Sequence, residues 1–207
     1  MSTSRRSFLH AAAVTAAVAP GSVLGANDRI NGALIGAGVR GTAVGQMMAK
    51  HATTKVVAVC DVDKGRREAF VKSIGQDAAL ENDWRRVIER KDVDAVIIAT
   101  PDHWHSPITI AALDAGKHVY VEKPLSNTVA GAVKMLEACE KHKNLVVQVG
   151  TMQRSAEHFQ EAAKIVREGG IGPVTQVVVN HGTGGMADRK PDTTPQPVPE
   201  GFDWELW

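Results

Sequence analysis

Cysteine, net charge and long apolar runs are all scarce in this sequence of 207 residues. The two cysteines, Cys60 and Cys139, are too few for a disulfide framework, and we expect both to be buried as small apolar residues. A net charge of +1 without a long basic run gives no electrostatic case for nucleic-acid binding. Beyond the N-terminal region, no apolar stretch reaches the roughly 18 residues that a membrane-spanning helix needs. The length suffices for one core but is short for two full domains.

The N-terminal region carries the pattern of an export signal. Arg5 and Arg6 precede a Phe-Leu pair and an apolar stretch over residues 11–19, and a small-residue site ends at Ala26. The paired arginines favour a signal of the twin-arginine type. We therefore expect residues 1–26 to be read by the twin-arginine translocase and the mature protein to begin near Asn27. The expected location is the bacterial periplasm, with retention at the membrane as the outcome of an uncleaved signal.

A glycine-rich fingerprint follows the first apolar strand. Residues 29–35 read as a buried strand, the motif Gly36-Ala-Gly38-Val39-Arg40-Gly41 comes next, and residues 42–50 read as a helix. In a dinucleotide-binding turn, the first glycine permits the tight turn, the second lets the backbone approach a pyrophosphate, and the third lets helix and strand pack closely. The pyrophosphate would lie at the N-terminus of the helix. The residues from Gly36 to Gly41 are therefore candidate cofactor-binding residues.

Asp61 supports the same interpretation and favours NAD over NADP. It ends the next strand, residues 55–60, and stands 20 residues after Gly41, where an acid binds the hydroxyls of the adenosine ribose. A carboxylate there would repel the 2′-phosphate of NADP. Three basic residues just downstream could reach such a phosphate, but we expect them to form the solvated first turn of the next helix: Lys64, Arg66 and Arg67.

Apolar strands and helices then alternate, which predicts an α/β fold with a doubly wound parallel sheet of the Rossmann type over residues 27–153. Ser106 is expected to cap a helix. After residue 154 we expect the beginning of a second, α+β domain, with a helix at 157–168 and a strand at 174–179. The carboxyl ends of parallel strands hold the ligand, and three motifs follow such ends: Thr100 to His105, Glu122 to Pro124, and Thr151 to Arg154.

These segments resemble the glucose–fructose oxidoreductase, inositol dehydrogenase and rhizopine-catabolism (Gfo/Idh/MocA) family, over about residues 30–207. The Glu122-Lys123-Pro124 segment is the most specific part of the match. The resemblance implies a Rossmann domain followed by an open-faced antiparallel sheet that often forms homo-oligomers. It also implies that Lys123 lies beside the nicotinamide and bonds the reacting hydroxyl, and that Arg154 reaches the cofactor or the substrate. The other residues implied in the cofactor pocket are Thr100, Pro101, His105, Glu122, Met152 and Gln153.

One feature of the family is missing. A histidine of the second domain usually serves as acid or base there, in a segment after an Asp-Trp-x-Leu-Trp stretch like residues 203–207. The sequence stops at this stretch, so we expect a C-terminally truncated member in which residues 154–207 are the start of the substrate domain. His181 could act as a substitute base. We expect Lys123 to be partly buried beside the nicotinamide.

The predicted function is oxidation or reduction of a sugar, cyclitol or related polyol by hydride transfer with NAD. An NAD-dependent glycosidase that uses transient oxidation is one alternative, and a non-catalytic protein that binds NAD or a sugar is another. His103 and His105 stand at a spacing too common to indicate a metal, and we expect none.

Overall fold

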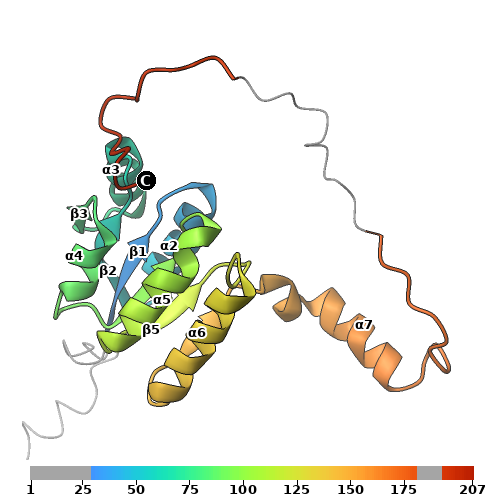
Figure 1. Cartoon of the computed structure of the whole chain (residues 1–207). Coiled ribbons are helices and arrows are strands. Elements are labelled where there is room, and N and C mark those ends of the chain that lie inside the picture. Colours follow the sequence, from blue (N-terminus) through green and yellow to red (C-terminus); the bar gives the residue numbers. More distant parts are fainter. Residues whose placement is uncertain (1–28, 181–192) are drawn as a thin grey trace, which may run out of the picture.

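The computed structural model describes residues 29–180 and 193–207, and its centre is a parallel sheet of six strands (Figure 1). The strand order is β3-β2-β1-β4-β5-β6, and every pair is parallel. Strand order reverses between β1 and β4, and ligands bind outside the carboxyl ends of the strands at such a point. The strands are β1 (Ile30–Ile35), β2 (Thr54–Cys60), β3 (Ala79–Glu81), β4 (Ala95–Ile98), β5 (His118–Val121) and β6 (Val147–Val149).

Helices cover both faces of the sheet, as in a doubly wound fold. Successive strand residues point to opposite faces, so Leu34 and Ile97 pack with Phe70 on one face. Ile35 and Ile98 pack with Leu113 on the other face. The first face is covered by α2 (Val39–Lys50) and α3 (Lys64–Ile74), and the second by α4 (Trp84–Glu89), α5 (His105–Asp114) and α6 (Val129–Lys141).

Short polar side chains cap several of these helices. Asp63 accepts a hydrogen bond from the backbone N of Arg66, and Asp83 accepts one from Arg85. Thr128 caps α6 in the same way. Each cap satisfies a backbone N–H that has no partner inside the helix, and such a cap contributes about 1 kcal/mol.

Two sequence-based expectations are corrected here. Ser106 lies inside α5, which continues directly from a 3-10 turn at Asp102–Trp104, and its hydroxyl donates to the carbonyl oxygen of Gly131 instead of capping the helix. The segment 174–179 forms no strand. It is exposed, and no described strand lies beside it, so its backbone has no ladder partner.

The segment after β6 extends away from the sheet (Figure 1). A 3-10 turn, η3 (Met152–Ser155), leads into α7 (Glu157–Arg167), where a helix was expected. None of the residues of α7 is buried. The predicted domain limits at 26, 153 and 154 remain predictions, although the change from a packed sheet to an exposed helix falls close to the second boundary. Among the described residues, no helix has both the length and the apolar character to cross a bilayer.

Candidate functional site

The glycine fingerprint forms the tight turn between β1 and α2. Gly36 has a φ of +94°, a conformation that residues with a side chain rarely adopt. A Cβ there would also lie 2.7 Å from the backbone of Ala99 and Thr100, and a Cβ on Gly41 would collide with the carbonyl oxygen of Gly36. The turn is therefore pressed between the end of β4 and α2, as predicted for the first and third glycines.

The N-terminus of α2 is open to an anion. Its N-cap is Gly38, no side chain caps it, and the first backbone bond of the helix runs from Thr42 to the carbonyl oxygen of Gly38. Val39 is 96% exposed, so the protein does not cover the first turn. Free N–H groups and the positive end of the helix dipole suit a pyrophosphate.

Asp61 lies at the end of β2 beside this turn. Its two carboxylate oxygens accept hydrogen bonds from the backbone N of Ala37 at 2.7 Å and of Asp63 at 3.0 Å. A carboxylate offers about four acceptor positions, so two remain for ribose hydroxyls. The turn, the open helix end and this acid together fit the adenosine and pyrophosphate parts of a dinucleotide.

The basic residues after Asp61 are not all solvated, which corrects one expectation. Lys64 is exposed. Arg67, by contrast, donates to the backbone carbonyl of Asp61. Arg66 pairs with Asp63 at 3.4 Å and lines the pocket beside Gly38. Arg66 is nevertheless exposed, as expected, so only Arg67 departs from the expected solvated turn.

An ion pair between a buried carboxylate and a half-exposed arginine connects the fingerprint to the strand end that carries Lys123. Glu122, at the end of β5, is 3% exposed, and its Oε1 accepts from Arg40 Nε at 2.8 Å and from the Tyr120 hydroxyl at 3.1 Å. Burial raises the pKa of the Glu122 carboxyl, but the hydrogen bonds from Arg40 and Tyr120 outweigh it and hold that pKa below its ordinary value. The hydrogen bond to Glu122 in turn raises the pKa of Arg40. The pair is therefore ionised at neutral pH.

Lys123 stands directly after this buried carboxylate. Its backbone N donates to Oε2 of Glu122 at 3.3 Å, which fixes the start of the loop. Its side chain is exposed among the described residues, and its burial beside a bound nicotinamide stays a prediction.

His105 joins two of the loops at the site. Its side chain is buried, and its ring nitrogens face the carbonyl oxygens of Pro124 at 2.7 Å and of Thr100 at 2.9 Å. The ring therefore connects the loop after β4 to the loop that carries Lys123. Thr100 and Pro101 line a pocket, and the Thr100 hydroxyl is buried without a hydrogen-bond partner.

The remaining predicted site residues are not brought together with these. Met152, Gln153 and Arg154 lie on the exposed turn η3 after β6, and His181 lies outside the described residues. The described ranges also hold no group of three or more His, Cys, Asp or Glu side chains placed to share a metal ion.

The pocket beside Asp61 has a volume of about 120 Å³, which is less than a whole dinucleotide would need. Gly36, Gly38, Asp61 and Thr100 line it, and neither Glu122 nor Lys123 does. Sequence reasoning missed the aromatic and apolar part of its wall. That part consists of Trp84, Phe202, Leu206 and Trp207; Trp104, which was expected as pocket wall or packing, lies with them.

Comparison with known proteins agrees with this geometry. The sequence model of the Gfo/Idh/MocA family, described as an oxidoreductase family with an NAD-binding Rossmann fold, matches residues 30–151. The inositol 2-dehydrogenase of Salmonella paratyphi B is 35% identical over 153 residues, which are 73% of this chain and 45% of that protein. Inositol 2-dehydrogenase 1 of Saccharopolyspora erythraea is 34% identical over 143 residues, covering 65% of this chain and 42% of the relative.

Solved structures show the same likeness. The scyllo-inositol dehydrogenase of Lactobacillus casei, with bound NAD(H) and scyllo-inositol, superposes with a TM-score of 0.67 and 28% identity, over 71% of this chain and 43% of that one. The myo-inositol 2-dehydrogenase of Lactobacillus plantarum gives a TM-score of 0.66 and 29% identity, over 70% and 43% of the two chains. The chain therefore spans less than half the length of the relatives that it matches.

Proposed function

The chain belongs to the Gfo/Idh/MocA oxidoreductase family with an NAD-binding Rossmann fold, and we propose from this that the protein transfers hydride between NAD and a hydroxyl-bearing carbon of a cyclitol, sugar or related polyol. The similarity to inositol dehydrogenases, two of whose structures hold NAD(H) with an inositol, supports a cyclitol as the first substrate to test.

The observation that carries this proposal is the ion pair between Arg40 and Glu122, 2.7 Å apart. Arg40 belongs to the first turn of α2, where a pyrophosphate fits, and Glu122 immediately precedes Lys123. The pair holds the two loops together across 82 residues of sequence. This link between the dinucleotide-binding turn and the loop of Lys123 supports a role for that lysine at the cofactor's reactive end.

Different residues bind the cofactor and act on the substrate. The open N-terminus of α2 binds the pyrophosphate, and Asp61 accepts hydrogen bonds from the adenosine ribose. The nicotinamide supplies the hydride acceptor or donor when NAD is bound. Lys123 bonds the reacting hydroxyl and polarises it, a contact that matters most in the transition state.

Two measurements test the proposal. Isothermal titration of NAD and NADP into the protein should show NAD binding more tightly, since Asp61 repels a 2′-phosphate. A panel of inositols, aldoses and aryl glycosides, followed by NADH absorbance, should show cyclitol- or sugar-dependent reduction of NAD. Absence of NAD binding would refute the cofactor assignment, and glycoside cleavage without net NADH formation would favour a glycosidase instead.

We also propose that the protein is exported by the twin-arginine route to the bacterial periplasm. The support is the sequence of residues 1–26, which lie outside the described residues. Replacement of Arg5 and Arg6 by lysine should leave the protein in the cytoplasmic fraction of a bacterial host, whereas replacement of Lys50 by arginine should not. Equal periplasmic amounts of all three forms would contradict export by this route.

A homo-oligomer is the remaining part of the proposal. Its support is α7, on which Phe159, Ile165 and Val166 are between 43% and 49% exposed. An exposed row of large apolar side chains often marks an interface. Light scattering after size exclusion should give a multiple of the monomer mass, and replacement of Phe159 and Ile165 by serine should lower that mass. A monomer at micromolar concentration would contradict it.

A further inference from the structure

The most distant described part of the chain returns to the Rossmann domain. Residues 199–207, here named the return segment, lie beside α3 at the end marked C in Figure 1. Phe202 forms an antiparallel bridge with Asp63, and the backbone N of Lys64 donates to the carbonyl oxygen of Gly201 at 3.0 Å. The return segment therefore pairs through its backbone with the loop that follows Asp61.

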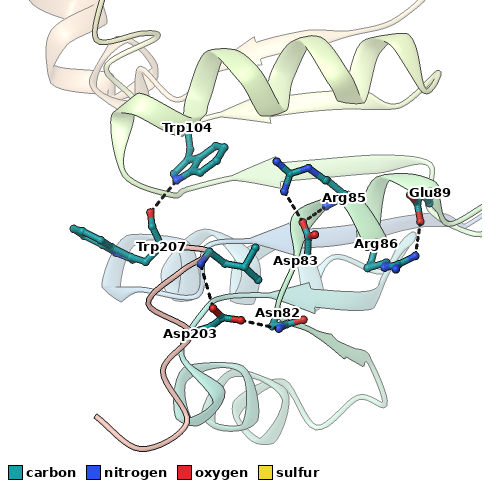
Figure 2. Close-up of polar contacts among 9 residues, drawn as sticks. Asn82, Asp83, Arg85, Arg86, Glu89, Trp104, Asp203 and Trp207 are labelled. Atoms are coloured by element: carbon teal, nitrogen blue, oxygen red, sulfur yellow. Dashed lines mark hydrogen bonds and ion pairs between the residues drawn. The ribbon is translucent and has the colours of Figure 1, made fainter. Parts of the chain in front are cut away.

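Asp203 fastens the return segment. Its backbone N donates to the carbonyl oxygen of Val62 at 2.9 Å. Its carboxylate accepts from the Asn82 side chain and from the backbone N of Leu206, both at 3.1 Å (Figure 2). The Trp104 indole N–H donates to the carbonyl oxygen of Trp207 at 3.3 Å. These bonds hold the segment against three different loops of the sheet edge.

The return segment and the dinucleotide-binding turn line the same pocket. Gly38 and Asp61 line this pocket together with Phe202, Leu206 and Trp207. Asp61 is the acid expected at the adenosine ribose, and adenine is bonded to that ribose. The space between Asp61 and the return segment therefore lies where the base would be, and its wall is apolar and aromatic.

We propose that the return segment forms the outer wall of the adenosine half of the cofactor site, with Leu206 and Trp207 contacting the adenine base. This inference rests on the proposed NAD binding. Adenine is a flat aromatic ring, and apolar and aromatic side chains bind its faces while excluding water. Because binding is reciprocal, a bound adenosine also holds the return segment on the domain.

The segment thus links the cofactor to a part of the chain more than 130 residues beyond the fingerprint. A ligand covered on two sides dissociates only when one side opens. NAD should therefore dissociate more slowly when the return segment is bound to the Rossmann domain. Both the affinity for NAD and its dissociation rate then depend on residues outside the sheet.

The test compares three variants: Trp207→Ala removes a contact, Asp203→Ala removes the fastening, and Glu205→Ala is the control. Glu205 is exposed and makes no described contact. The probes are NAD, ADP-ribose and nicotinamide mononucleotide, titrated calorimetrically, with stopped-flow measurement of NAD release. Trp207→Ala and Asp203→Ala should each weaken NAD and ADP-ribose by about tenfold and speed NAD release. Nicotinamide mononucleotide should be unaffected, and Glu205→Ala should bind like the wild type.

The possible outcomes separate this inference from the proposed function. If the wild type binds NAD and the variants bind it equally well, the return segment is not a wall of the site. If Trp207→Ala or Asp203→Ala binds NAD more tightly, the segment blocks the pocket and the inference is overturned. If the wild type binds neither NAD nor ADP-ribose, the cofactor assignment itself fails. Circular dichroism of each variant, with Leu206→Ala as a milder second contact variant, separates loss of the wall from loss of the fold.

Discussion

Replacement of Glu122 by glutamine should destabilise the protein in a way that depends on pH. The buried carboxylate accepts hydrogen bonds from Arg40, Tyr120 and the backbone N of Lys123. Glutamine has nearly the same shape and keeps one oxygen acceptor, so it removes the charge without leaving a cavity. The change therefore isolates the electrostatic part of the network.

The magnitude follows from the surroundings of the two partners. A hydrogen bond to a charged group contributes about 1.5–3 kcal/mol. The Arg40 side chain is 40% exposed, so solvent screens its share. The bond from Tyr120 is more protected, and glutamine can still accept it. We therefore expect Glu122→Gln to lower the free energy of unfolding by about 1–3 kcal/mol at pH 7.

The sign of the pH effect is fixed by the pKa of Glu122, which is lower in the folded than in the unfolded protein. A group of this kind stabilises the fold fully above its unfolded pKa of about 4.3 and loses that contribution as the pH falls through its folded pKa. The stability difference between wild type and Glu122→Gln should thus stay constant from pH 7 to about pH 5 and shrink below that. Glutamine has no such titration.

Urea unfolding followed by circular dichroism, at a series of pH values, measures this difference. Glu137→Gln is the control, because Glu137 is exposed on α6 and makes no described contact. Taking the difference between variants at each pH cancels the titration of all other carboxylates. Equal stability of wild type and Glu122→Gln at pH 7, or a deficit that persists unchanged at low pH, would refute an ionised and stabilising Glu122.

Three further predictions concern the cofactor and the reaction. Asp61→Ala should narrow the preference for NAD over NADP, measured by titration, since it removes the repulsion of a 2′-phosphate and a charge-assisted hydrogen bond of about 1.5–3 kcal/mol; an unchanged preference would contradict the role of Asp61. Lys123→Ala should abolish turnover but keep NAD binding within about tenfold, whereas Lys134→Ala, on the exposed face of α6, should change neither. Gly41→Ala should unfold at a lower urea concentration and bind NAD more weakly, because its Cβ would collide with the backbone of Gly36. Wild-type stability of this variant would show that the turn can shift to accept a side chain.

Much of the fold was predictable because its signals are local. The apolar strands and the turn at Gly36 to Gly41 depend on neighbouring residues, and the structure confirms them. The edge strand β3 was missed, since its three residues are too few to show a periodic pattern. The segment 174–179 was wrongly predicted as a strand, because its composition favours one but a strand needs a partner.

The sequence identified candidate residues of the site but not the contacts between them. Arg40 and Glu122 were both expected near the cofactor, yet nothing in the sequence indicates that they pair with each other across the sheet edge. The placement of Phe202 against Asp63 has no local signal either. Contacts between residues so distant in the chain form only once the whole domain has folded. Local periodicity and motif spacing do not predict them.

The two ends of the cofactor site differ in how they are built, and this separates two experimental questions. At the adenosine end, Asp61 and the return segment enclose a pocket among described residues. At the other end, Lys123 and Met152 are exposed. We therefore expect cofactor affinity to depend on contacts that the described residues already make, and turnover to depend on how a substrate is held over exposed groups. A variant of Lys123 that lost NAD binding as severely as one of Asp61 would show that the two ends are not independent.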